Sequence, residues 1–143
     1  MKILIINGPN LNFLGKREPE IYGKDTLSDI IEYTIKETES LGAEISAFQS
    51  NCEGEIIDAL YRAYEEGIEG IVLNGGAYSH YSIAIRDAIS SVKIPCVEVH
   101  LSNIYAREEF RHRSVLSAVC SGVICGFGKQ VYPLAIKALC EMK

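Results

Sequence analysis

The chain has 143 residues, of which 48% are hydrophobic, and this is enough to form one globular domain with its own core. Its formal net charge of -5 argues against a general nucleic-acid or anionic-membrane surface, because phosphate binding depends on concentrated Lys and Arg. A small ligand, including an anionic one, stays open.

The apolar run that follows Lys2 is much shorter than the apolar region of a signal peptide, and no run in the sequence approaches the length of a membrane span. We therefore expect a cytoplasmic protein without a membrane partner. The 5 cysteines form an odd set without a C-x-x-C pair and lie mostly among apolar neighbours, so we expect neither a disulfide nor a zinc site.

The first predicted strand is the β-rich segment 2–7, and an unusually long connection, Gly8 to Asp25, follows it. Connections from strand to helix usually need about 2 to 6 residues, and this one is about three times as long. It carries Arg17 and Tyr22. Because such long loops are usually functional or disordered, we expect an active-site lid at about residues 15–25.

The first long helix is predicted over residues 27–41, where apolar side chains recur on one side at about 100° per residue. Thr26 and Asp29 form a capping box at its start, and Gly42 ends it. Segment 44–50 alternates between apolar and polar residues and predicts the second strand.

Strands and helices continue to alternate in the rest of the chain. The apolar segments 69–74, 95–100 and 121–128 predict three more strands, and a last helix begins near Pro133, which suits a first helical turn, and runs to the C-terminus. The two helices between them are expected to bury Ile56, Leu60, Ala63 and Tyr64, ending at Gly67, and Tyr81, Ala84, Ile85, Ala88 and Val92.

This alternation, with strands apolar enough to be covered on both faces, predicts an α/β fold: a doubly wound, five-stranded parallel sheet with helices on both faces. The flavodoxin-like strand order 2-1-3-4-5 fits the length, and we expect one catalytic domain over residues 1–143. In such sheets ligands bind beyond the carboxyl ends of the strands, near the point where the strand order reverses.

Glu98 and His100 lie near the end of the fourth predicted strand and alternate on the same face of it. A carboxylate in this position orients the imidazole and sets its tautomer. An unpaired carboxylate buried in a parallel sheet would cost too much free energy to be incidental. The pair therefore indicates a site.

Other polar residues near this edge have a plain interpretation beside a functional one. His80 and Asp87 are two helical turns apart and would share a helix face, or they are a helix-terminal His and an unrelated surface acid. Arg107 and Arg111 would share a face of a short helix and hold a carboxylate, or they belong to a solvated charge run. His112 has no evident partner and is expected to be exposed.

Turn-forming residues follow the first and third strands. The segments 7–10 (NGPN) and 74–76 (NGG) are equally consistent with tight turns, in which case Asn74 caps its strand end. Ser102 and Asn103 would begin the short helix after the fourth strand, where free N–H groups form an anion cradle.

The long connection adds a base with its activator. A tyrosine ionises only near pH ~10, so it is a poor base at neutral pH unless a neighbouring cation stabilises the phenolate. Arg17 lies five residues before Tyr22 and supplies that charge if the loop folds over. Residue chemistry alone thus predicts a small anionic substrate, proton transfer and a lid.

Two other classes of protein share this architecture. A flavodoxin-like small-ligand or FMN-binding module needs a hydroxyl-rich phosphate loop after the first strand, but NGPNLN has neither Ser nor Thr and contains a Pro without an N–H donor. A receiver-type signalling module needs acidic residues after the first strand and at the end of the third, where Asn7 and Asn74 stand instead.

Four segments, in order and at the family's spacing, resemble those of type II 3-dehydroquinate dehydratases, and together they extend over essentially the whole chain. The segments are INGPNLNFLGKREPEIYG, FQSNCEGEIIDAL, LNGGAYSHYSIAIRDAI and PCVEVHLSNIYAREEFRHRSVLS.

The resemblance implies the reversible dehydration of 3-dehydroquinate to 3-dehydroshikimate, a shikimate-pathway step in aromatic amino acid biosynthesis, without metal or organic cofactor. Type I enzymes, of unrelated fold, use a Schiff-base lysine. Type II enzymes instead remove a proton from the carbon next to the ketone, pass through an enolate and expel the C1 hydroxyl.

The resemblance also implies catalytic roles. Tyr22 is similar to the family's base, and Arg17 to the residue that stabilises the phenolate and the transition state. Asn10 resembles the Asn that holds a water against the enolate oxygen. His100 resembles the general acid, and Glu98 its orienting carboxylate.

The same resemblance implies a binding set. Asn74 and His80 would hold ring hydroxyls, the backbone N–H groups of Leu101 and Ser102 would take the substrate carboxylate, and Arg111 would contact a hydroxyl.

Two further residues are given roles by the resemblance. Asp87 would act at a neighbouring subunit's site, and Arg107 would help to position the lid. Because family members assemble as trimers grouped into dodecamers, a homo-oligomer, and specifically a dodecamer, is implied.

The sequence departs from the family's usual pattern at Gly75, where many relatives have Pro or Ala, at Cys52, where many have His, and at Ala59, where Trp is frequent. None of these positions carries a proposed catalytic group, so the departures concern loop stiffness and packing.

Overall fold

The computed structural model describes residues 1–142, so Lys143, which the predicted domain and last helix include, lies outside the described residues. Five parallel strands form one sheet in the order β2-β1-β3-β4-β5, which confirms the predicted fold class and strand order. The strands are β1 (Lys2–Asn7), β2 (Glu44–Gln49), β3 (Gly70–Asn74), β4 (Cys96–His100) and β5 (Gly122–Cys125).

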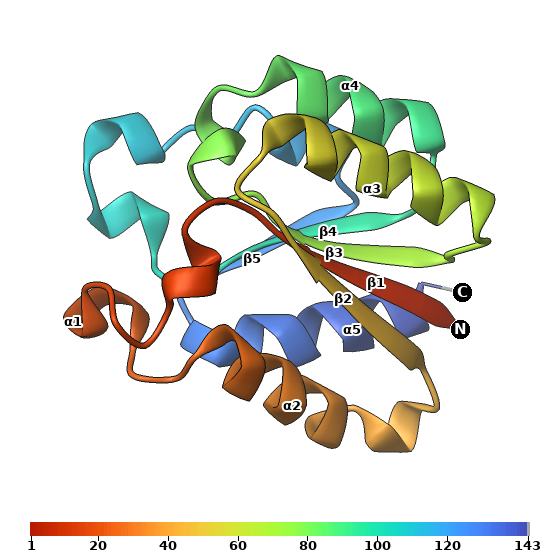
Figure 1. Cartoon of the computed structure of the whole chain (residues 1–143), viewed down its shortest axis with the longest axis horizontal. Helices are drawn as coiled ribbons and strands as arrows, with labels where there is room; N and C mark the ends of the chain where they lie inside the picture. Colours follow the sequence, from red (N-terminus) through yellow and green to blue (C-terminus); the bar gives the residue numbers. More distant parts are fainter. Residues whose placement is uncertain (143) are drawn as a thin grey trace.

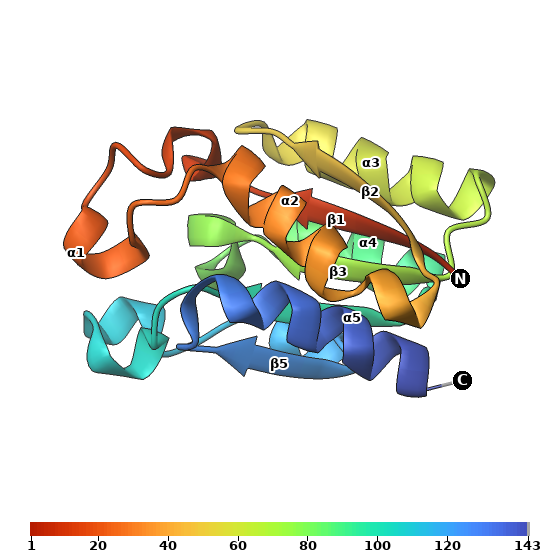
Figure 2. The ribbon, with the colours of Figure 1, turned by 90° about the horizontal axis from the view of Figure 1, so that it is seen from below.

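Helices cover both faces of the sheet (Figure 1). α3 and α4 lie on one face and α2 and α5 on the other, whereas α1 projects beyond the carboxyl ends of the strands (Figure 2). The helices are α1 (Pro19–Tyr22), α2 (Leu27–Glu37), α3 (Glu53–Glu65), α4 (Ile83–Val92) and α5 (Val131–Glu141). No helix within residues 1–142 is long and apolar enough to cross a membrane.

The core has two layers because successive side chains of a strand point to opposite faces of the sheet. In β3, Val72 joins the cluster under α2 and α5, whereas Ile71 and Leu73 join the cluster under α3 and α4. Every residue of β3 and β4 is buried. These two central strands are therefore covered on both faces, and their buried polar residues are Asn74, Glu98 and His100.

The start of α2 matches the predicted capping box. The Thr26 hydroxyl accepts a hydrogen bond from the Asp29 N–H at 3.1 Å, and the Asp29 carboxylate accepts one from the Thr26 N–H at 3.0 Å. The helix ends earlier than predicted, at Glu37, and a separate 3-10 turn, Glu39–Leu41, leads to Gly42. Gly42 has φ 69°, in the left-handed region that favours glycine.

Two predicted helix faces need correction. In α3 the exposed fraction of Tyr64 is 66%, because the buried stripe runs through Ala59 instead. α4 begins only at Ile83, so Tyr81 precedes the helix and is exposed. The buried stripe of α4 consists of Ile85, Ala88, Ile89 and Val92, and Ala84 lies outside this stripe.

The loops that follow β1 and β3 pack against each other through their backbones. The Gly8 N–H donates to the Asn74 carbonyl at 2.8 Å. A Cβ atom at Gly8 would come within 2.6 Å of the Gly75 carbonyl oxygen, so only glycine allows this approach. The contact brings the segments after β1 and β3 to the same edge of the sheet.

Candidate active site

A cavity of about 100 Å³ is lined by residues at the carboxyl ends of β1, β3 and β4 and by the segment that contains α1. Most of the residues predicted from the sequence line it, although they come from separate parts of the chain. These residues are Asn10, Arg17, Tyr22, Asn74, His80, His100, Leu101, Ser102, Arg107 and Arg111. Among the pocket residues that were not predicted are Pro9, Leu11, Gly76, Ala77 and Ile104.

The long connection after β1 places Tyr22 and Arg17 together over the cavity. An Arg17 Nη2–H group donates to the Tyr22 hydroxyl oxygen at 3.1 Å. The guanidinium carbon of Arg17 lies 4.3 Å from the centre of the Tyr22 ring, and that of Arg107 lies 5.1 Å from it. Two guanidinium groups therefore lie against one half-buried phenol ring.

Local sequence explains how this segment is held. Leu11 and Leu14 are buried and anchor its base in the core below α2 and α5. Pro19 begins α1, a position in which its missing N–H is not needed. At the far end Asp25 pairs with Lys129 at 3.3 Å. The connection is thus fixed at both ends, and α1 projects between them (Figure 2).

Glu98 and His100 form the predicted pair at the end of β4. The His100 Nε2–H group donates to Glu98 Oε2 at 2.5 Å, and Glu98 is fully buried. Burial by itself raises the pKa of Glu98, but hydrogen bonds from His100 and from two serine hydroxyls outweigh it and hold the pKa below its ordinary value. The pair leaves Nδ1 of His100 available to a ligand.

His80 lies beside His100, but not on a helix with Asp87. The two imidazole rings are stacked with centroids 6.1 Å apart. His80 belongs to the 3-10 turn Gly76–His80, whereas Asp87 belongs to α4, so the predicted shared helix face is wrong. Asp87 is exposed and does not line the cavity.

Desolvation lowers the pKa of His80, and the neighbouring His100 and Arg111 lower it further, against the effect of a hydrogen bond to the Arg113 carbonyl. Because a carbonyl only accepts, the Nδ1–H group of His80 is the donor, at 2.8 Å. Its Nε2 atom is therefore the nitrogen free to meet a ligand.

Asn74 combines both interpretations of its position. It lines the cavity, and its Oδ1 accepts from the Gly76 N–H at 3.2 Å, as a strand-end cap does. Its Nδ2–H group donates to the Tyr132 hydroxyl at 3.0 Å, and that hydroxyl donates to Asn7 Oδ1 at 2.5 Å. Burial raises the pKa of Tyr132 and keeps it a neutral donor.

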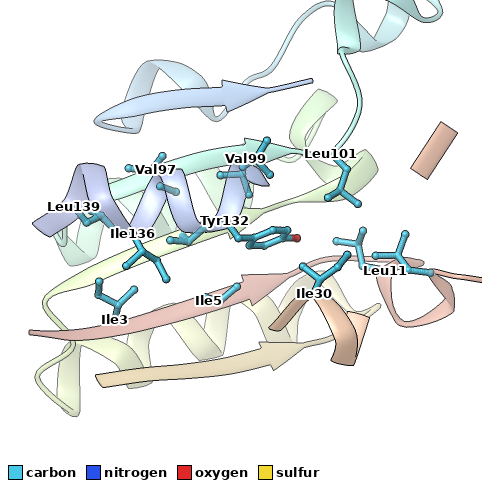
Figure 3. Packing of buried hydrophobic residues seen from close by; sticks show 14 residues of the cluster. Ile3, Ile5, Leu11, Ile30, Val97, Val99, Leu101, Tyr132, Ile136 and Leu139 are labelled. Carbon is cyan, nitrogen blue, oxygen red and sulfur yellow. The ribbon is translucent and has the colours of Figure 1, made fainter. Parts of the chain in front are cut away.

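Tyr132 was not predicted from the sequence, because it belongs to the apolar stripe of α5 and gives no polar signal of its own. It is completely buried beside Ile5, and its hydroxyl points to the side of the core where Ile30 and Leu11 lie (Figure 3).

Arg107 and Arg111 both reach the cavity, but they do not share the predicted helix. The segment contains two 3-10 turns, Ile104–Ala106 and Glu109–Arg111, and Arg107 lies between them. Arg107 donates to the Ser102 hydroxyl at 3.3 Å. His112 is exposed, as predicted, but the expectation that it has no partner is wrong, because its Nε2–H group donates to the Arg107 carbonyl at 3.0 Å.

Asn10 reaches the cavity from a backbone conformation that suits it. Its φ is 69°, in the left-handed region that Asn adopts more readily than most residues. Its N–H donates to Asn51 Oδ1 at 2.9 Å, which ties the loop after β1 to the loop after β2.

Possible metal ligands are sparse around this cavity. Within residues 1–142 no group of three or more His, Cys, Asp or Glu side chains is arranged to hold a metal ion. The cations that line the cavity are Arg17, Arg107 and Arg111, so its chemistry suits an anionic ligand with several oxygen atoms.

Comparison with known proteins identifies close relatives over nearly the full length. The chain is 58% identical over 143 residues to a 3-dehydroquinate dehydratase of Clostridium beijerinckii, covering 100% of this chain and 97% of that protein. It is 54% identical over 141 residues to one of Caldicellulosiruptor bescii, covering 99% and 97%.

Solved structures agree with this likeness. The type II dehydroquinase of Butyrivibrio crossotus superposes with a TM-score of 0.95 at 52% identity, covering 97% of each chain. That of Propionibacterium acnes gives 0.93 at 44% identity, covering 98% of this chain and 96% of the other. The model of the family Dehydroquinase class II matches residues 1–140. The chain therefore belongs to the class II dehydroquinase family.

Proposed function

We propose that this protein is a type II 3-dehydroquinate dehydratase that converts 3-dehydroquinate to 3-dehydroshikimate and water through an enolate. The observation that supports the proposal best is the arrangement of two proton-transfer groups around one cavity. An arginine-bound phenol, Tyr22, lies on the lid side, and a carboxylate-bound imidazole, His100, lies on the sheet side.

The first step is removal of a proton from the carbon next to the ketone. Tyr22 acts as a phenolate base, and the Arg17 guanidinium at 3.1 Å stabilises its negative charge. The electron pair of the broken C–H bond moves onto the ketone oxygen and forms an enolate. Asn10, at the cavity edge, holds a water against that oxygen.

The second step expels the C1 hydroxyl. The enolate oxygen re-forms the ketone, the carbon–carbon electron pair of the enolate forms the new double bond to C1, the C–O bond at C1 breaks, and His100 donates a proton so that the leaving group departs as water. Glu98 keeps the ring oriented through the 2.5 Å hydrogen bond to Nε2, so Nδ1 is the nitrogen that delivers the proton.

The remaining polar groups position the substrate. Asn74 and His80 contact ring hydroxyls, and Arg111 contacts another, while the backbone N–H groups of Leu101 and Ser102 bind the carboxylate. All five residues line the cavity. Such fixed donors place the reacting carbon near the base without reorganisation during the reaction.

The proposed mechanism uses no Schiff base and no cofactor. A mechanism without a Schiff base is supported by the cationic side chains around the cavity, which are three arginines. A guanidinium stays protonated and so does not act as the amine nucleophile that a Schiff base requires.

We also infer a wider context for the enzyme: one catalytic domain with a lid at about residues 15–25, acting in the cytoplasm on a shikimate-pathway intermediate. We infer a homo-oligomer, a dodecamer built from trimers, in which the exposed Asp87 contributes to a neighbouring subunit's site.

The direct test is a spectrophotometric assay of purified protein with 3-dehydroquinate, in which absorbance of the conjugated enone is followed. The proposal predicts a steady rise in enone absorbance that is proportional to enzyme concentration. A folded protein that produces no enone, with the product independently shown to be stable under the same conditions, would contradict it.

A further inference from the structure

Behind the Glu98 and His100 pair lies a second layer of hydrogen bonds from a distant segment. The Ser114 hydroxyl donates to Glu98 Oε1 at 3.0 Å, and the Ser117 hydroxyl donates to the same oxygen at 2.7 Å. Oε2 of the carboxylate is bonded to His100. Both oxygens of a fully buried carboxylate are thus occupied, one by the serines and the other by the imidazole.

The Ser114 hydroxyl has only one way to orient its proton. Its oxygen accepts from the N–H groups of Leu116 at 3.1 Å and Ser117 at 3.3 Å. Because a hydroxyl has one proton and two acceptor sites, the proton is left for Glu98. The turn from Ser114 to Ser117 therefore fixes the donor before it meets the carboxylate.

The segment that carries these serines is itself anchored to the rest of the fold. The Val115 N–H donates to the Ser79 carbonyl at 2.8 Å, and the Val115 carbonyl accepts from Arg86 Nη1 at 2.9 Å. Leu116 is fully buried in the core under α3 and α4. Since the anchors lie outside the cavity, the segment holds its position independently of a ligand.

The same segment also holds the second histidine of the cavity. The Arg113 carbonyl accepts the Nδ1–H group of His80 at 2.8 Å. Residues 113–117 therefore orient His80 directly and His100 through Glu98, and the two rings are stacked 6.1 Å apart.

We propose that Ser114 and Ser117 are positioning residues for the dehydration step: they lock the Glu98 carboxylate in the rotamer and charge state that directs His100 toward the departing hydroxyl. This proposal rests on the proposed function for its catalytic consequence. Neither serine lines the cavity, so neither touches the substrate.

The charge state matters because Glu98 has few other partners to stabilise its negative charge. The titratable groups that interact with Glu98 are His100, His80 and Cys96, and Arg111 in turn acts on His80. A hydrogen bond to Cys120 and burial raise the pKa of Cys96, which stays a neutral thiol. Removal of both serine donors would leave Oε1 buried without a partner, and Glu98 would then take up a proton more readily.

The test compares Ser114→Ala, Ser117→Ala and the double variant with the wild type in the dehydratase assay. We expect the double variant to lose about tenfold or more in kcat, a size typical of groups that orient a functional histidine, with little change in KM. The acid limb of its pH profile should move to higher pH. Ser117→Thr, which keeps the hydroxyl, should retain most of the activity, and Ser90→Ala, an exposed serine of α4, is the matched control.

A double-mutant cycle separates positioning from a general structural effect. In a Glu98→Gln background the serine substitutions should have almost no further effect on kcat, because the group they act through is gone. An equal loss in both backgrounds would overturn the proposal, and so would an unchanged kcat and pH profile in the double variant. If the double variant does not fold, the two single variants are taken through the same cycle.

Crystal structures of the wild type and the serine variants give a readout that does not depend on turnover. We expect the Glu98 carboxylate to rotate or the His100 ring to turn when the serine hydroxyls are absent, and unchanged side chains would overturn the proposal. A wild type without turnover would count against the proposed function alone, and these structures would still decide the role of the serines.

Discussion

At the scale of single residues, two hydrogen bonds hold the two groups to which we assign opposite proton transfers. Arg17 donates to the phenol oxygen of Tyr22, and Glu98 accepts from the imidazole of His100. In the proposed mechanism, the first arrangement stabilises an anion that takes a proton, and the second orients a group that gives one. The two pairs come from segments about 80 residues apart in the chain, so the fold is needed to assemble them.

Replacement of Tyr22 by Phe tests the base. The variant keeps the ring under Arg17 and Arg107 but lacks the oxygen that would take the proton. We expect kcat to fall by at least about 100-fold, the lower range for loss of a general base, with unchanged unfolding in urea. Turnover close to that of the wild type would remove Tyr22 from this role.

The buried carboxylate of Glu98 predicts a dependence of stability on acid. Because the pKa of Glu98 in the folded protein lies below its ordinary value of 4.5, its stabilising contribution is complete above that pH and is lost as the pH falls through the lower folded value. The free energy of unfolding, from urea titrations between about pH 7 and pH 3, should therefore fall more steeply in the wild type than in Glu98→Gln. Parallel curves would show that this carboxylate is not linked to folding.

At the scale of elements, the site depends on the loops after β1 and β3 lying in direct backbone contact. Gly8 permits this contact, and Asn10 follows it in the left-handed conformation. Asn74 caps the end of β3 while it lines the cavity. A change that separates the two loops should therefore affect both folding and the site.

Gly8→Ala tests the contact between the loops. Its new Cβ would lie 2.6 Å from the Gly75 carbonyl oxygen, and the backbone must move, so we expect a loss of about 1–3 kcal/mol in the free energy of unfolding. The control is Gly54→Ala in α3, where a Cβ meets nothing within 4 Å; helix propensity predicts no loss or a gain of up to about 1 kcal/mol there. Equal effects at the two positions in urea titrations would contradict the role given to Gly8.

Sequence patterns predicted those parts of the fold and site that depend on local spacing. The capping box of Thr26 and Asp29 needs only residues three positions apart, and the pairing of Glu98 with His100 needs only strand alternation. Residue chemistry suggested that Arg17 activates Tyr22 for proton transfer if the loop folds over, but only the family resemblance assigned a particular reaction to the pair.

The parts that were not predicted depend on contacts between residues that are far apart in the sequence. Ser114 and Ser117 reach Glu98 from 16 and 19 residues away, through a chain reversal that no local pattern specifies. Tyr132 meets Asn7 across 125 residues. The shared face of His80 and Asp87 was wrong because Ser82 caps a new helix between them: its hydroxyl accepts from the Ile85 N–H. Helical spacing thus has no meaning across this boundary.

At the scale of the whole molecule, the proposed oligomer would place the exposed Asp87 of one subunit at the active site of a neighbouring subunit. Asp87 lies on α4, outside the cavity of its own chain. If it completes a neighbouring subunit's site, each active site needs residues from two copies.

Mixed oligomers test whether one active site combines residues of two subunits. Asp87→Ala and Tyr22→Phe variants should each be weakly active alone. After joint unfolding and refolding, mixed oligomers should regain part of the wild-type turnover, because some sites combine an intact Tyr22 with an intact Asp87 from the neighbour. Activity that stays at the average of the two separate variants would contradict a shared site, as would a monomer in sedimentation experiments.

We propose that Tyr22 and His100 carry out the dehydration without covalent attachment of the substrate. The most direct measurement is to incubate the enzyme with 3-dehydroquinate and borohydride, remove the small molecules, and then record turnover and protein mass. We predict full remaining activity and an unchanged mass, because the cavity's cations are arginines and no imine is formed to be reduced. Loss of activity together with a mass gain of one reduced substrate on a lysine would contradict the mechanism.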